Sequence, residues 1–163
     1  MKTIFIAGGC FWGVQAYYDK LKGIDKTFVG YANGNISNPT YQQVKSHEAT
    51  HSETVKIIYD ETIISLEKIL EHFLRIIDPY EVNHQGEDYG IQYRTGVYYE
   101  SEKDKEIIER YFNSIEKEKD FAIEVLRLEN FYDAEEYHQK YLYKNPSGYC
   151  HVNFSLIKDN ERK

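Results

Sequence analysis

A chain of 163 residues that is 41% hydrophobic and 29% charged predicts one globular domain, residues 1–163, and argues against a disordered segment. The formal net charge of −7 argues against a nucleic acid or an anionic membrane as partner. No apolar run is long enough to cross a membrane and no secretory signal is recognisable, so we expect a cytoplasmic protein.

The N-terminal part of the chain predicts a strand followed at once by a helix. The apolar run of residues 2–7 is typical of a buried strand, and Gly8-Gly9 ends it. Apolar residues then recur at helical spacing from Phe11 to Leu21. Cys10 therefore lies at a glycine-rich junction between a strand and a helix, ahead of a second strand expected at residues 27–32.

The rest of the chain alternates long polar loops with regular elements. Residues 33–52 and 79–92 are rich in polar and turn-forming residues and predict surface loops, which often carry function. Between them, residues 54–59 alternate as a strand does, and residues 66–77 have helical spacing with Ser65 as N-cap. Further elements are expected as a strand at 93–99, a helix at 101–115, a strand at 123–125, a helix at 134–141 and an irregular tail from 147. This alternation predicts an α+β fold, a two-layer α/β sandwich around one sheet.

The chain has two cysteines, Cys10 and Cys150, and each thiol needs its own explanation in a reducing compartment. At a helix N-terminus, backbone N–H groups and a partial positive charge favour the thiolate, which is the nucleophilic form. The position of Cys10 fits a catalytic nucleophile, but it fits a buried inert thiol equally well. Trp12 matches the apolar face of the helix poorly, so we expect it to line a pocket beside Cys10.

Two carboxylates, Glu53 and Asp88, lie within or next to the polar loops. Each fits a solvated surface group. If Glu53 faces an aromatic pocket instead, burial raises its pKa and makes it a general acid. The histidines are scattered, no C-x-x-C motif occurs and no phosphate-binding glycine motif is present, so neither a metal nor a cofactor is expected.

Several short motifs follow one another along the chain in a fixed order. They are Gly8-Gly9-Cys10-Phe11-Trp12-Gly13, Val29-Gly30-Tyr31-Ala32, Asn38-Pro39-Thr40-Tyr41, His51-Ser52-Glu53, Gln85-Gly86, Asp88, Gln92-Tyr93-Arg94, His138-Gln139 and Lys144-Asn145-Pro146. In this order and spacing the chain resembles the peptide methionine sulfoxide reductase A family over essentially its whole length. The resemblance implies a ferredoxin-like core with long loops and a coiled C-terminal tail.

The resemblance also implies an activity: reduction of the S epimer of methionine sulfoxide, free or in proteins, without a bound cofactor. It implies Cys10 as the nucleophile, Glu53 as the acid and Cys150 as the resolving thiol. The implied substrate pocket has methyl-binding walls at Phe11 and Trp12, hydroxyls for the sulfoxide oxygen at Tyr41 and Tyr93, and a positioning acid at Asp88. A partner dithiol, expected to be thioredoxin, would reduce the disulfide between the two cysteines.

Two features depart from the family pattern. The acid motif reads Thr50-His51-Ser52-Glu53, where the family usually has Gly-His-Ala-Glu, and residues 151–163 contain no third cysteine for a three-thiol relay. Two other classes of function also stay open on the sequence. One is a cysteine hydrolase or transamidase with His51 or His138 as base. The other is a non-catalytic binding module with an aromatic pocket.

Overall fold

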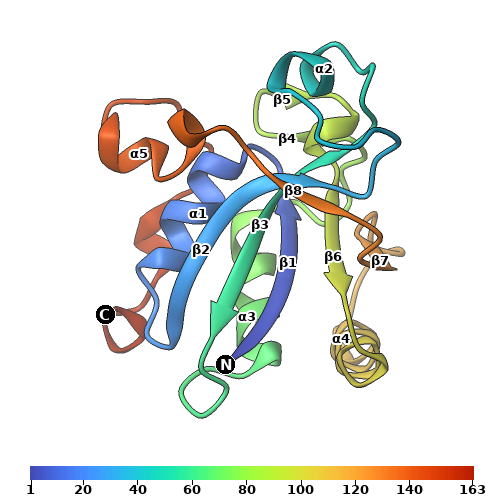
Figure 1. Cartoon of the computed structure of the whole chain (residues 1–163). Coiled ribbons are helices and arrows are strands. Elements are labelled where there is room, and N and C mark those ends of the chain that lie inside the picture. Colours follow the sequence, from blue (N-terminus) through green and yellow to red (C-terminus); the bar gives the residue numbers. More distant parts are fainter.

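The computed structural model describes residues 1–163 and has a mixed α/β fold around one curled six-stranded sheet (Figure 1). The strand order is β7-β6-β1-β3-β2-β8, and β4 and β5 form a separate hairpin. The strands are β1 (Lys2–Gly8), β2 (Ile24–Ala32), β3 (Ser52–Tyr59), β4 (His84–Gln85), β5 (Asp88–Tyr89), β6 (Thr95–Tyr99), β7 (Glu124–Arg127) and β8 (Phe131–Asp133). The helices are α1 (Phe11–Asp19), α2 (Tyr41–Lys45), α3 (Leu66–Ile76), α4 (Glu102–Ser114) and α5 (Tyr141–Lys144). None of them combines the length and apolar character needed to cross a membrane.

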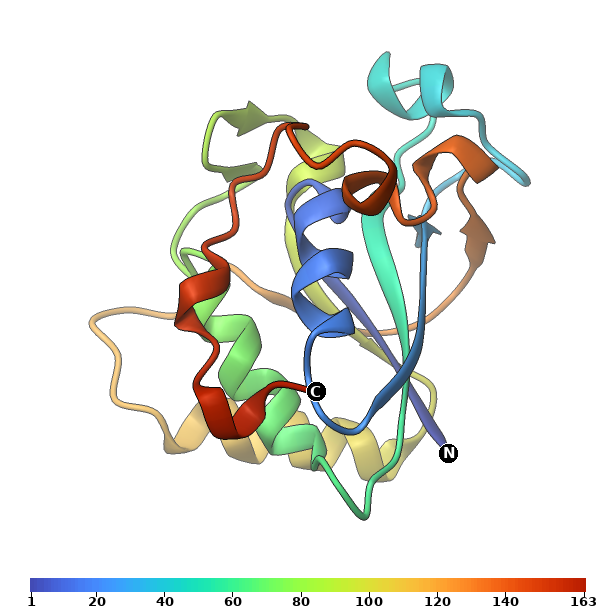
Figure 2. The ribbon, with the colours of Figure 1, turned by 90° about the vertical axis from the view of Figure 1, so that its left-hand side faces the viewer.

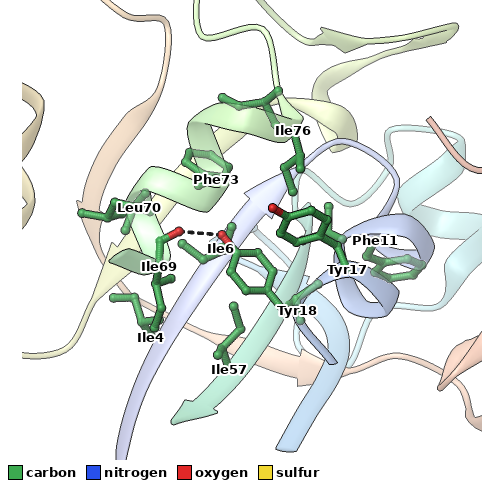
Figure 3. Close-up of a cluster of buried hydrophobic side chains, with 14 of the residues drawn as sticks. Ile4, Ile6, Phe11, Tyr17, Tyr18, Ile57, Ile69, Leu70, Phe73 and Ile76 are labelled. Carbon is green, nitrogen blue, oxygen red and sulfur yellow. Dashed lines mark hydrogen bonds between the residues drawn. The ribbon is translucent and has the colours of Figure 1, made fainter. Parts of the chain in front are cut away.

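The main core lies between the sheet and helices α1 and α3, which cover one of its faces (Figure 2). Side chains of β1, α1 and α3 meet there, and the Tyr18 hydroxyl donates to the Ile69 carbonyl at 2.8 Å (Figure 3). This bond satisfies the polar tip of a fully buried tyrosine. The opposite face carries a small cluster around Phe5 and Tyr98, covered by Leu128 and Phe131. The mixed α/β class predicted from the sequence is confirmed.

Several expected elements differ in extent from those in the structure. The loop expected at 33–52 contains α2, because Thr40 and Gln43 form a reciprocal capping box. The loop expected at 79–92 contains the β4–β5 hairpin. The helix expected at 134–141 is wrong: Lys140 has a φ of 55°, in the left-handed region, which interrupts the helix and leaves a 3-10 turn at 136–138 followed by the short α5. Strand β8 was not expected.

Two of the long connecting segments lie at the end of the sheet near Cys10. Figure 1 shows α2 and the β4–β5 hairpin at this same end. Glu53, expected to precede the strand, lies inside β3 and pairs with Tyr31 of β2. Tyr93, expected within a strand, ends a 3-10 turn just before β6. Rigid strand ends and irregular segments therefore surround one place in the molecule.

Candidate active site

A cavity of about 170 Å³ lies at this end of the sheet. Its walls are Cys10, Phe11, Trp12, Tyr41, Glu53, Asp88, Tyr93 and Tyr149. The structure thus brings together every site residue expected from the sequence except Cys150. Tyr149 was not expected, and its only signal in the sequence is its position next to Cys150.

Cys10 is the N-cap residue of α1 and is 7% exposed. Burial raises the pKa of this thiol well above its ordinary value, and the charge of Glu53 acts in the same direction. The backbone N–H of Trp12 lowers the pKa, as expected at a helix N-terminus, but burial outweighs this effect. In the free protein Cys10 is therefore a thiol, and it forms a thiolate only when another group assists.

Glu53 is the group that can assist Cys10 in this way, and it is 2% exposed. Its Oε1 accepts a hydrogen bond from the backbone N–H of Phe11 at 3.2 Å, which ties β3 to the first turn of α1. Burial raises the pKa of Glu53 to about 8; the Phe11 N–H lowers it, and the charge of Asp88 raises it further. The sequence left open that Glu53 is a solvated surface carboxylate, and this interpretation is wrong. At pH 7 the carboxyl group mainly keeps its proton.

Trp12 is held at the cavity by two contacts with segments far along the chain. Its Nε1–H donates to Nδ1 of His138 at 3.0 Å, and its ring stacks on Tyr141 with centroids 3.7 Å apart. Phe11 is 1% exposed and belongs to both the main core and the cavity wall. The two side chains form an apolar wall beside the thiol, suited to a small apolar group.

Tyr41 and Tyr93 also line the cavity. Burial raises the pKa of Tyr41 to about 12 and also raises that of Tyr93, so both hydroxyls keep their protons and can donate hydrogen bonds. The backbone N–H of Tyr41 donates to Glu135 Oε2 at 2.8 Å, and the Tyr31 hydroxyl donates to Glu135 Oε1 at 2.8 Å. Glu135, which the sequence did not single out, thereby attaches α2 to the sheet.

Asp88 and Tyr149 lie on the side of the cavity formed by the β4–β5 hairpin and the C-terminal segment. Burial raises the pKa of Asp88, and this effect is larger than those of His151 and Tyr149, which lower it. The hairpin is fixed by Gln85, whose side chain accepts from the Asp78 N–H at 2.9 Å and donates to the Asp78 carbonyl at 2.8 Å. The hairpin can therefore hold a carboxyl at the cavity.

Cys150 lies outside this cavity. Its half-buried thiol lines a second cavity of about 140 Å³. The other walls of that cavity are Ala16, Lys20, Leu142, Tyr143, Pro146, Gly148 and Phe154. The Cys150 Sγ accepts the backbone N–H of Val152 at 3.4 Å, and both cysteines are free thiols.

The two histidines considered as bases are not among the residues that line the Cys10 cavity. His51 is fully buried against Tyr132, and His138 accepts from Trp12. No histidine lines the Cys10 cavity, which argues against a cysteine hydrolase. Ser52, a departure from the family motif, is accommodated because its hydroxyl bonds the Tyr98 hydroxyl at 3.0 Å.

Comparison with known proteins identifies close relatives. A family model described as "Peptide methionine sulfoxide reductase" matches residues 2–163. A relative from Ureaplasma urealyticum, named peptide methionine sulfoxide reductase MsrA, is 52% identical over 160 residues, which is 97% of this chain and 97% of that protein. A relative of the same name from Lachnoclostridium phytofermentans is 56% identical over 153 residues, 93% of this chain and 92% of that protein.

Solved structures of Mxr1 from Saccharomyces cerevisiae are also similar. The reduced form has a TM-score of 0.85 at 34% identity and covers 93% of this chain and 91% of its own. An unusual oxidized form has a TM-score of 0.65 at 34% identity, covering 93% and 86%. The same protein in complex with Trx2 has a TM-score of 0.57 at 25% identity, covering 86% and 84%.

Proposed function

The chain belongs to the peptide methionine sulfoxide reductase family, and we propose that in it Cys10 is the nucleophile that reduces methionine S-sulfoxide to methionine. The observation that carries this assignment is the cavity itself. One buried thiol stands beside an apolar aromatic wall, and a carboxyl that keeps its proton at pH 7 lines the same cavity. Methionine sulfoxide presents three groups that match these features: a sulfur for the thiol to attack, a methyl group for the apolar wall and a negative oxygen for the carboxyl.

The first chemical step uses both the thiol of Cys10 and the carboxyl group of Glu53. Attack of Cys10 sulfur on the substrate sulfur moves electrons onto the sulfoxide oxygen, which takes the proton of Glu53 while Tyr41 and Tyr93 donate hydrogen bonds to it. Glu53 then takes the proton that Cys10 loses. The bond between the substrate sulfur and its hydroxyl then breaks, the hydroxyl bonds to the Cys10 sulfur, and the bond between the two sulfurs breaks, so that methionine leaves and Cys10 becomes a sulfenic acid. A protonated Glu53 suits this role because the same group gives one proton and receives the other.

The methyl wall and the oxygen site together set the handedness of the substrate. Phe11 and Trp12 receive the methyl group, while Glu53 and the two tyrosine hydroxyls receive the oxygen. Only one arrangement of these two groups around the sulfur then places the lone pair and the peptide chain correctly. We therefore expect the S epimer to be reduced and the R epimer to remain.

The second half of the cycle regenerates the thiols. Cys150 attacks the sulfenic acid, a disulfide forms and water leaves. A dithiol protein then reduces the disulfide by exchange, and the yeast relative solved with Trx2 supports thioredoxin in this role. Since both cysteines must return to thiols, we place the enzyme in the cytoplasm, where such reductants maintain thiols. Cell fractionation tests this location.

We also assign the core to the ferredoxin-like plait, within one catalytic domain. The order β6-β1-β3-β2, with α1 and α3 as the connections on one face, supports this assignment. In this arrangement β1 is central, and its C-terminal end carries Cys10 into the site.

The proposed function is tested by a single turnover. Reduced protein is mixed with each epimer of a blocked methionine sulfoxide, without added reductant, and methionine and protein mass are measured. We expect about one equivalent of methionine from the S epimer and loss of two hydrogens from the protein, as a disulfide requires. Absence of methionine, or equal reduction of the R epimer, would contradict the proposal. Hydrolysis of an ester or amide substrate instead would support the cysteine hydrolase class.

A further inference from the structure

Tyr41 belongs to a helix that is too short to hold its own position. The helix α2 has five residues, and Tyr41 is the first of them, directly after the N-cap Thr40. Helices of this length do not persist in water by themselves, so contacts with the rest of the molecule must fix α2. Val44 provides one contact, because its side chain is fully buried in the main core. One buried side chain leaves the start of the helix free to pivot, so Tyr41 needs a second contact.

Glu135 provides this second contact from a segment 94 residues further along the chain. Its Oε2 accepts the backbone N–H of Tyr41 at 2.8 Å, and Figure 2 shows the segment that follows β8 beside α2. The first N–H groups of a helix have no partner within it, and the capping box of α2 uses those of Thr40 and Gln43. The Glu135 carboxylate therefore satisfies a donor that the capping box leaves free.

The other oxygen of Glu135 binds the central sheet. Its Oε1 accepts the hydroxyl of Tyr31 at 2.8 Å, and Tyr31, which is fully buried in β2, pairs with Glu53 of β3. Burial raises the pKa of Glu135, but hydrogen bonds from Tyr41, from its own N–H and from Tyr31 together lower it below its ordinary value. Glu135 is therefore a carboxylate at neutral pH, and both of its oxygens accept hydrogen bonds. Two hydrogen bonds thereby connect the strands that carry the acid to the start of the helix that carries Tyr41.

We propose that Glu135 is a positioning residue of the reduction, which sets the place of the Tyr41 hydroxyl relative to the carboxyl group of Glu53; this inference rests on the proposed function. The ring of Tyr41 also packs against the ring of His138, with centroids 4.6 Å apart, and His138 ends the 3-10 turn that Glu135 precedes. One turn of the chain therefore holds both the backbone and the ring of Tyr41. Glu135 is not among the residues that line the Cys10 cavity, so it acts on the sulfoxide oxygen through Tyr41.

The charges around the Tyr41 hydroxyl indicate which step depends on its position. Burial raises the pKa of Tyr41 most, and the charges of Glu53 and Cys10 raise it further, as expected for a hydroxyl close to both reacting groups. The bond from this hydroxyl to the sulfoxide oxygen strengthens as charge moves onto that oxygen. An interaction of this kind raises the maximum rate more than it raises the affinity for substrate.

Glu135→Ala should therefore lower the maximum rate of single-turnover reduction of blocked methionine S-sulfoxide. We expect a loss of about tenfold, the lower end of the range for one hydrogen bond to a charged group. The half-saturating sulfoxide concentration should change by less than about twofold, because Phe11 and Trp12 still bind the methyl group. Quenched-flow measurement of methionine over a range of sulfoxide concentrations gives both values. A raised half-saturating concentration with an unchanged maximum rate would contradict the proposal.

Glutamine and aspartate at position 135 separate the effect of geometry from that of charge. In Glu135→Gln the side-chain carbonyl can accept the Tyr41 N–H while the amide donates to the Tyr31 hydroxyl, so the maximum rate should stay within about threefold of wild type. Glu135→Asp keeps the charge but is one methylene shorter, so it cannot reach both donors unless α2 moves. Its rate should fall as in Glu135→Ala. A higher rate in Glu135→Asp than in Glu135→Gln would overturn the positioning role.

A double-mutant cycle tests whether Glu135 acts through Tyr41. Combined with Tyr41→Phe, Glu135→Ala should lower the maximum rate by less than about twofold, whereas combined with Tyr93→Phe it should keep its full effect. Glu136→Ala removes the neighbouring carboxylate, whose side chain is 91% exposed, and should leave the rate unchanged. If Glu135→Ala does not fold, Glu135→Asp takes its place in the cycle.

The outcomes of this cycle distinguish the positioning role from the proposed function. Equal losses in the Tyr41→Phe and Tyr93→Phe backgrounds would overturn the positioning role, because Glu135 would then act on the site as a whole. Failure of the wild-type protein to form methionine would instead overturn the proposed function.

Discussion

The two cysteines show how differently one chain holds two thiols that must meet. Cys10 stands between β1 and α1, with its neighbours fixed by the hydrogen bonds of a sheet and a helix. Cys150 lies outside any helix or strand and is docked by side-chain contacts over glycines. A group that meets the substrate must be placed accurately, whereas a group that has to move is better held by few contacts. We conclude that the nucleophile is built into the core and the resolving thiol is not.

The surroundings of the two thiols differ in charge as well. Burial raises the pKa of both thiols. The charge of Glu53 raises the pKa of Cys10 further, whereas the Val152 N–H and the charge of Lys20 lower that of Cys150. Cys10 is thus the thiol whose ionisation depends on a partner in the site. Cys150 depends on reaching its target. The following variants are designed to break or sharpen this contrast.

The largest effect is expected from the two cysteine variants compared directly. Cys10→Ser should abolish reduction of the S epimer, because a hydroxyl is a far poorer nucleophile toward sulfur than a thiol. Cys150→Ser should still form about one equivalent of methionine and should then retain oxygen on Cys10. The measurements are methionine released and intact protein mass. Substantial activity in Cys10→Ser, or unimpaired recycling of Cys150→Ser by thioredoxin, would reverse the assigned roles.

Glu53→Gln should give the next largest effect, on the first chemical step alone. Glutamine can still donate a hydrogen bond to the sulfoxide oxygen but cannot transfer a proton readily. General acid–base catalysis typically contributes about 100- to 10,000-fold, so we expect a loss in that range in stopped-flow single turnover. Disulfide formation by Cys150 should change less. A rate within about threefold of wild type, well under that range, would show that Glu53 is not the acid.

Trp12→Ala should weaken substrate binding more than it weakens the fold. Trp12 lines the cavity and stacks on Tyr141 at the edge of the core, so its removal opens the methyl wall. We expect the half-saturating sulfoxide concentration to rise about tenfold, with an unfolding free energy lowered by less than about 3 kcal/mol. Substrate titration and thermal unfolding of one preparation provide both values. A larger loss of stability with unchanged binding would place Trp12 in the core instead.

The last test concerns a pH dependence of stability caused by Glu53. Its pKa is 4.5 in an ordinary setting and about 8 in the folded protein. The stability that the neutral carboxyl contributes is therefore complete below pH 4.5 and is lost as pH rises to about 8, by at most about 1.4 kcal/mol per pH unit. Glu53→Gln does not ionise, so its melting temperature relative to wild type should rise across this interval. A difference that does not change with pH would mean that Glu53 titrates like an exposed carboxyl.

Local sequence patterns predicted the parts of the site that depend on neighbouring residues. The short apolar run, the glycines and the helical spacing placed Cys10 at a strand-to-helix junction, and α1 does begin directly after it. Ser65 caps α3 as expected, by accepting the Lys68 N–H. These features follow from backbone geometry and periodicity, which act over a few residues. The sequence predicted Glu53 just outside its strand, because the local alternation of apolar and polar residues does not show the pairing with β2 that extends β3.

The motifs of the chain by themselves determined which chemical groups are present: a thiol, an acid, an aromatic pair and a second thiol. Only the tertiary structure decided their state. Glu53 keeps its proton because its burial outweighs the N–H of Phe11, 42 residues earlier in the chain, which by itself favours the charged carboxylate. Tyr149 enters the nucleophile's cavity while Cys150 does not, because the docked C-terminal segment fits over glycines from two distant regions. Burial and orientation depend on contacts between segments far apart in sequence, which no local pattern records.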